Sequence, residues 1–251
     1  MSDSLDDLRQ HRTESIDHFL KAVYTLQQQI DPTDAVSTTH LAQYLRITAP
    51  SVTDMIKRLS GAEDDKPKKD SKDSKDSERA PRLTPLLEYL PYKGVRLTPE
   101  GEKIALEVIR HHRLLELYLY QELGYTWDEV HDEADRLEHV ISEQLEARIA
   151  AVLGNPSLDP HGDPIPALDG TITERKQVHL SDLQVDQAAT VSRIVDQSPE
   201  VLRYLSDLGL IPGASVKILG RSPLNDTLNL QVSGNTYTIS TQVARKVLMS
   251  S

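Results

Sequence analysis

The chain has 251 residues, a formal net charge of -11 and no cysteine. Its length allows one large domain, or two to three small domains that each bury a core. Without cysteine there is no disulfide, thiolate zinc site or iron–sulfur cluster, so a metal site must use histidine and carboxylate ligands. No apolar run reaches the roughly 18 residues of a membrane span, and the N-terminus lacks a signal-peptide pattern. We therefore expect a cytoplasmic protein with no membrane partner.

The negative charge is concentrated in the middle of the chain. Residues 111–177 hold 5 Lys and Arg against 14 Asp and Glu, whereas residues 178–251 hold 6 against 6. So acidic a segment repels itself unless it binds cations or keeps its charges in water. The charge alone does not decide between a cation site and a solvated acidic face.

Residues 14–30 carry apolar side chains at helical spacing and predict a helix that the sequence DPTD ends. His18 lies roughly 130° from the centre of the apolar stripe. We therefore expect His18 to face solvent or another domain, and not the core of its own helix.

Residues 36–61 predict two short helices joined by a tight turn. The first runs from Ser37 to Leu45 and the second begins at Thr48, with Ser37 and Thr48 as N-caps. This spacing is typical of a helix-turn-helix, although two helices joined by a turn also occur without DNA. The candidate DNA-contacting residues are Thr48, Pro50, Ser51, Thr53, Lys57 and Arg58.

Residues 62–82 are a charged insertion with a repeated Lys-Asp-Ser unit, too polar to bury, and we expect a loop there. Its lysines either reach DNA phosphates or belong to a tolerated insertion. The next stretch, LLEYLPYKGVRLTPEG, predicts a hairpin and a helix that starts at Pro99. A hairpin after a helix-turn-helix makes a winged module, in which Lys93 and Arg96 lie near the DNA backbone.

Helices are predicted over 99–122 and 127–153, and a proline-rich irregular linker over 154–178. After it, ATVSRIV, ASVKILG, TLNLQVS and TYTIS predict the strands of a small β-barrel, with one helix at 199–208. The chain is thus predicted to be mainly α with a small β module.

The helix predicted over 127–153 carries clustered histidine and carboxylate. His131, Asp135, Glu138 and His139 fall within an arc of roughly 100°, beside the apolar stripe and not in it. Neighbours on one helix face have Cβ atoms only about 5–6 Å apart, so these side chains can converge on a single cation. The alternative is a set of surface pairs worth about 0.2–0.5 kcal/mol each.

The preceding helix carries a second pair, His112 and Glu116, at i, i+4. Two antiparallel helices joined by the sequence GYT would bring both sets together, which looks like a pair of metal sites. The chain has no His-Glu-x-x-His, Gly-x-Ser-x-Gly, Walker or dinucleotide glycine motif. We therefore expect no enzyme and no small organic cofactor.

Seven stretches together resemble the diphtheria-toxin-repressor and manganese-transport-regulator family of metal-dependent bacterial repressors. They are HFLKAVYTL, ITAPSVTDMIKRL, VRLTPEG, HHRLLE, VHDEADRLEHV, HGDPIP and LSDLGLIPGASVKI. The resemblance spans nearly the whole chain. It implies a winged helix-turn-helix DNA-binding domain over 1–97, a helical dimerisation and metal-binding domain over 98–153, a linker over 154–178, and an SH3-like (FeoA-like) domain over 179–251.

The resemblance also implies two metal sites, and so about two ions per subunit. The first site would use His18, Asp135, Glu138 and His139. The second would use His112, Glu116 and His131, and Glu200 of the SH3-like domain is a further candidate ligand.

The chain departs from both branches of the family. The iron-responsive branch has a sulfur ligand in place of Asp135 and Met in place of His18, whereas the manganese branch has a carboxylate and an Asp at these positions. A sulfur-free set of carboxylate and imidazole favours Mn²⁺, with Fe²⁺ as the alternative.

We therefore expect a homodimer whose two recognition helices, about 34 Å apart, bind a palindromic double-stranded DNA operator. Metal binding would favour the DNA-competent form, and the targets would be metal-uptake genes. Two other hypotheses stay open: a metalloenzyme that uses the same ligands with an open coordination position, and a metal-insensitive DNA-binding protein.

Overall fold

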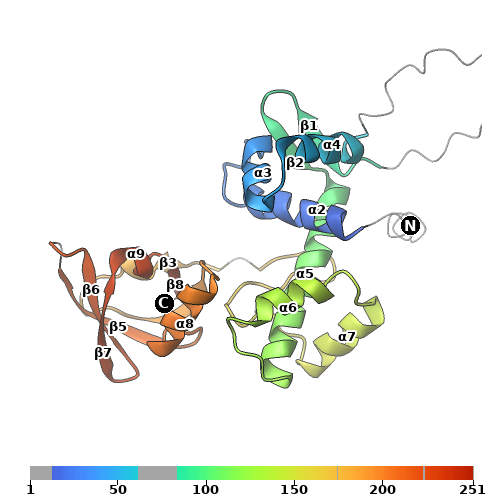
Figure 1. Cartoon of the computed structure of the whole chain (residues 1–251). Helices are drawn as coiled ribbons and strands as arrows, with labels where there is room; N and C mark the ends of the chain where they lie inside the picture. The colour runs from blue at the N-terminus through green and yellow to red at the C-terminus, as the bar shows by residue number, and fades with distance from the viewer. Residues whose placement is uncertain (1–12, 62–83, 174, 223, 251) are drawn as a thin grey trace, which may run out of the picture. The chain divides into compact units, whose positions relative to one another are not determined.

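A computed structural model describes residues 13–61, 84–173, 175–222 and 224–250 (Figure 1). The charged insertion predicted over 62–82 lies outside the described residues. The chain divides into two compact units, residues 1–108 and 109–251. The division falls within helix α5 (Pro99–Glu122), and each unit is described by itself.

The first unit begins with helices α2 (Glu14–Gln27), α3 (Thr38–Leu45) and α4 (Ala49–Leu59). The Ser37 and Thr48 side chains accept hydrogen bonds from the first turns of α3 and α4, as their sequence predicts. Between these helices Arg46 adopts φ 54°, which makes the turn tight. The predicted helix-turn-helix is therefore confirmed.

Strands β1 (Leu87–Leu90) and β2 (Gly94–Leu97) form the antiparallel hairpin that follows. The hairpin is held to the segment before α3 by mutual backbone hydrogen bonds between Val36 and Val95, each 2.9 Å. A Cβ on Gly94, which has φ +131°, would lie 2.1 Å from the carbonyl oxygen of Val36. Only glycine allows this approach of the wing to the helix-turn-helix.

Gly94→Ala is expected to destabilise the first unit by about 2 kcal/mol or more, since it combines backbone strain with a backbone clash. Gly124→Ala is the matched control, because Gly124 also has positive φ (+74°) but has no atom within 4 Å of the added Cβ. The control is expected to cost only about 1 kcal/mol. Thermal unfolding of the two variants measures the difference; equal destabilisation would show that the Val36 contact does not matter.

The helical part of the second unit contains most of α5, then α6 (Val130–Leu137) and α7 (Glu143–Val152). The single helix predicted over 127–153 is therefore wrong, since the chain turns between the two. Ser142 starts the second helix by accepting a hydrogen bond from the Leu145 backbone N–H. The apolar stripe predicted for this helix includes Leu145 and Val152, but both are exposed, so the stripe ends at the break.

Helix α7 instead turns a mixed face inward, with buried Glu146, Ile149 and Ala150. Glu146 accepts a hydrogen bond from Arg110 Nε at 2.5 Å and lies 3.3 Å from His111 Nε2. Burial raises the pKa of Glu146, but the hydrogen bonds from His111 and Arg110 outweigh burial and lower it. The carboxylate thus joins α7 to α5 in its ionised form.

The C-terminal module, residues 178–250, is a six-stranded antiparallel sheet of order β3-β8-β4-β5-β6-β7. Its strands are β3 (Val178–His179), β4 (Ala188–Ile194), β5 (Ser215–Ser222), β6 (Thr227–Val232), β7 (Asn235–Ser240) and β8 (Val247–Ser250). A 3-10 turn (Leu180–Asp182) and helices α8 (Pro199–Asp207) and α9 (Thr241–Ala244) complete it. Four strands and α8 lie where the sequence predicts them, while β3 and β8 were missed.

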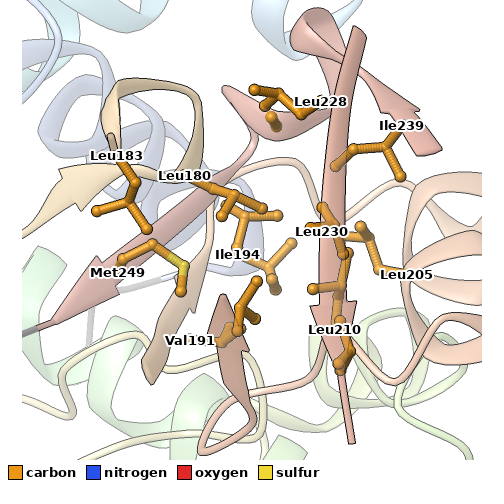
Figure 2. Packing of buried hydrophobic residues seen from close by; sticks show 14 of the residues in the cluster. Leu180, Leu183, Val191, Ile194, Leu205, Leu210, Leu228, Leu230, Ile239 and Met249 are labelled. Atoms are coloured by element: carbon orange, nitrogen blue, oxygen red, sulfur yellow. The ribbon is translucent and has the colours of Figure 1, made fainter. Parts of the chain in front are cut away.

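Alternating apolar residues of these strands form one core, together with leucines of α8 and the turn after it (Figure 2). Leu230 and Ile194 are among its completely buried members. Trp127, which precedes α6 in the sequence, also packs in this cluster. Among the described residues, no helix is both long and apolar enough to span a membrane.

Candidate metal centre

The second unit gathers histidines and carboxylates from two helices around one buried imidazole. His112 of α5 is 5 % exposed. Its Nε2 lies 2.9 Å from Glu116 Oε1 and 3.1 Å from His131 Nδ1. Its Nδ1 lies 2.6 Å from Glu138 Oε2 and 3.2 Å from Asp135 Oδ1. Both ring nitrogens of His112 thus face potential metal ligands.

Three of these atoms form a nearly equilateral triangle. His112 Nε2, Glu116 Oε1 and His131 Nδ1 are separated by 2.9, 3.1 and 3.1 Å. Adjacent ligands around an octahedral ion with bonds of about 2.1 Å lie about 3.0 Å apart. The three atoms therefore fit one face of an octahedral divalent cation, and this is the set predicted for the second site.

Glu116 stays ionised although it is almost completely buried, with 1 % of its surface exposed. Burial raises its pKa, but the charge of His112 and hydrogen bonds from His112, His131 and His161 outweigh burial and hold the pKa well below its usual value. An ionised, buried carboxylate among imidazoles is the form that binds a cation.

Glu116 also belongs to a further group of potential ligands, with Asp159 and His161, that was not predicted. Asp159 and His161 lie on the other side of the Glu116 carboxylate. His161 is completely buried; its Nε2 donates to the Trp127 carbonyl at 2.8 Å, while Nδ1 lies 3.8 Å from Glu116 Oε2. Burial lowers the pKa of His161, but Glu116 and Asp159 outweigh it and raise the pKa to about 8. Burial, Asp163 and Glu116 raise the pKa of Asp159 well above its usual value.

Asp159 and His161 come from the segment predicted to be an irregular linker. The backbone over 154–173 is indeed irregular, but Asp159, His161 and Asp163 are buried. The sequence signal was the stretch HGDPIP, which places a histidine and an aspartate among prolines. Its burial makes the segment part of the metal centre's surroundings.

Three further predicted ligands lie outside this triangle: His139, His18 and Glu200. His139, just after α6, has Nε2 3.3 Å from Glu138 Oε1, and Glu138 is buried. His18 lies half-buried on α2 of the first unit, and its role as a ligand stays a prediction. Glu200 is exposed in the first turn of α8 and belongs to none of the ligand groups found in the described part of the chain.

The predicted DNA-contacting face of α4 is exposed. Val52, Ile56 and Leu59 form its buried side. The exposed residues are Thr48 at the N-cap of α4, Pro50, Ser51, Thr53, Lys57 and Arg58 on α4, and Lys93 on the wing. Arg96 is half-buried and its Nε donates to the Asp34 carbonyl at 3.0 Å, so it holds the loop before α3 in place.

Three family models match the chain in order. An iron dependent repressor N-terminal DNA binding domain matches residues 11–64, and an iron dependent repressor metal binding and dimerisation domain matches 98–167. A FeoA domain matches 178–250. A helix-turn-helix with a histidine and carboxylate centre on a dimerisation domain defines a metal-dependent transcriptional regulator.

Full-length relatives agree with this class. The iron-dependent repressor IdeR of Mycobacterium leprae is 29 % identical over 80 % of this chain and 81 % of its own. The diphtheria toxin repressor of Corynebacterium glutamicum is 28 % identical over 80 % and 82 %. A solved manganese-dependent transcriptional repressor in complex with manganese is 33 % identical, covers 94 % of this chain and 99 % of its own, and superposes with a TM-score of 0.75. The chain belongs to this family of metal-dependent transcriptional repressors.

Proposed function

We propose that this repressor responds to Mn²⁺, with Fe²⁺ as the alternative, and binds a palindromic operator as a homodimer in the cytoplasm. The observation that carries the proposal is the triangle of His112, Glu116 and His131, in which His112 and Glu116 are buried. The ligands contain no sulfur, and oxygen and imidazole ligands suit manganese and ferrous iron. The similarity to a repressor solved with manganese supports the same choice.

The ligand residues explain why the repressor needs a cation. Glu116 and Glu138 are each 1 % exposed and approach the same imidazole, so their charges repel each other at low dielectric. A bound divalent ion supplies the positive charge that offsets this repulsion. The side chains from α5 and α6 then hold one arrangement, which favours the DNA-competent form over the others.

We further propose two ions per subunit. The first site uses Asp135, Glu138, His139 and, as predicted, His18. The second site uses the triangle, and Asp159 and His161 lie on the far side of Glu116. The dimerisation and metal-binding domain would start near residue 98 and include the buried stretch around His161.

The test is a gel-shift titration of the full chain with a duplex selected from random-sequence DNA in the presence of Mn²⁺. Binding is expected in Mn²⁺ or anaerobic Fe²⁺ and loss of binding in chelator, with Zn²⁺ for comparison. Equal affinity in chelator and in Mn²⁺ would support a metal-insensitive DNA-binding protein. Mn²⁺ binding without any DNA selection would favour the metalloenzyme.

Glu116→Gln is expected to remove one of the two Mn²⁺ binding events, because a neutral amide replaces the carboxylate shared by three histidines. Titration calorimetry of the full chain measures the stoichiometry. Glu122→Gln is the control, since Glu122 is exposed on the same helix and should keep both events. An unchanged stoichiometry in Glu116→Gln would place the second site elsewhere.

A further inference from the structure

The turn formed by residues 159–163 is closed by its own hydrogen bonds. One oxygen of Asp159 accepts hydrogen bonds from the backbone N–H groups of His161 and Asp163, both at 2.8 Å. The Asp159 N–H donates to the Asp163 carbonyl at 3.0 Å. The turn thus presents Asp159 and His161 together, as one hydrogen-bonded element, beside Glu116.

Strand β4 of the C-terminal module packs directly against this turn. The Ile194 N–H donates to the His161 carbonyl at 2.9 Å. A Cβ on Gly162, which has φ +87°, would lie 2.0 Å from the Ser192 carbonyl oxygen. Backbone therefore meets backbone here, and the position of β4 fixes the position of His161.

The Asp163 carboxylate joins the 159–163 turn to the C-terminal module by ionic and hydrogen-bonding contacts. Asp163 is 3 % exposed. Its carboxylate lies 2.5 Å from Arg193 and 3.5 Å from Arg113 of α5, and accepts a hydrogen bond from Gln197 at 2.6 Å. A carboxylate this buried requires such partners, because an uncompensated charge in the interior is strongly unfavourable. Two of its three partners come from the C-terminal module.

We propose that Arg193, with Gln197, is a positioning residue for the metal centre. By pairing with Asp163 it docks the C-terminal module on the 159–163 turn and keeps His161 and Asp159 against Glu116. The module thus shapes the second cation site through the turn. This inference rests on the proposed function for the site itself, but the docking is measurable without metal.

Trp127 reports on the docking, because it is the single tryptophan of the chain. It is 6 % exposed, packs in the core of the C-terminal module, and stacks on His161 with ring centroids 5.7 Å apart. If the module loosens from the turn, Trp127 becomes accessible to a small quencher in solution.

The experiment compares Arg193→Gln with Arg193→Lys and Arg203→Gln in the full chain. Arg203 is the matched control, since it pairs with Asp128 of the helical part at 3.5 Å but is exposed. In chelator, acrylamide quenching of Trp127 is expected to rise at least twofold in Arg193→Gln and to stay unchanged in Arg203→Gln. Arg193→Lys, which keeps the charge, should return most of the protection.

In a Mn²⁺ titration, the second binding event is expected to weaken about tenfold in Arg193→Gln and to recover in Arg193→Lys, as for other residues behind metal ligands. Unchanged quenching in Arg193→Gln would overturn the docking role. Increased quenching with unchanged Mn²⁺ affinity would overturn the link to the metal centre. If the unsubstituted chain bound no second ion, the proposed function of the site would fail, while the quenching result would still decide the docking.

Discussion

Asp135→Ala is expected to lower Mn²⁺-dependent operator binding at least tenfold, to the level seen in chelator. The Asp135 carboxylate lies 3.2 Å from His112 Nδ1 and 3.6 Å from His131 Nε2. Its side chain is 39 % exposed, so the substitution removes a proposed ligand without opening a cavity in the core. Loss of a supporting residue alone weakens metal affinity about 10- to 100-fold, and loss of a direct ligand, the role proposed for Asp135, should weaken it at least as much.

Gel shifts at fixed Mn²⁺ and titration calorimetry measure the two effects, and thermal unfolding in chelator checks that the fold persists. Asp132→Ala is the matched control, because Asp132 is an exposed acid on the same helix. If both alanine variants reduced DNA binding equally, the general negative charge of α6 would matter, and not coordination by Asp135.

Local signals made the helix-turn-helix and the His112–Glu116 pair predictable from sequence. Ser37 and Thr48 are N-caps whose effect depends only on residues up to three positions away. The i, i+4 spacing on one helix likewise places His112 beside Glu116 with no knowledge of the rest of the fold. Such features follow from the chain's nearest neighbours.

The break between α6 and α7 shows where this reasoning fails. Leu137, Ile141 and Leu145 continue an apolar pattern across the break, so periodicity alone predicts one helix. What decides the outcome is the N-cap at Ser142 together with burial of Glu146, whose partners lie on α5. A buried acid is a sign of long-range pairing that the local pattern does not contain.

His161 and Asp159 were missed for the same reason. Four prolines over 154–178 predict irregular backbone, and irregular segments are usually exposed. Here the partners of the segment are the Trp127 carbonyl, Glu116 and Arg193, which are 30 to 45 residues away in sequence from the residues they contact. Only the packed second unit brings them together and turns a proline-rich stretch into part of the centre.

His18→Ala is expected to separate metal binding from DNA binding. The triangle of His112, Glu116 and His131 lies entirely in the second unit and contains no residue of the helix-turn-helix. The variant should therefore keep the Mn²⁺ event that depends on Glu116. If His18 is a ligand of the first site, it is the residue through which the DNA-binding unit senses the ion, so operator affinity in Mn²⁺ should fall by the 5- to 150-fold typical of coupling between sites.

His18→Asp gives the sharper comparison, because it replaces imidazole by a carboxylate, which is also a ligand for Mn²⁺. It should recover much of the Mn²⁺-dependent operator binding that alanine loses, whereas a purely structural role on the half-buried face of α2 would make a charged carboxylate worse than alanine. Wild-type DNA binding in His18→Ala would show that the response to metal passes through the second unit alone. Operator affinity in Mn²⁺ that falls in the order wild type, His18→Asp, His18→Ala would therefore indicate coordination by residue 18 and not packing.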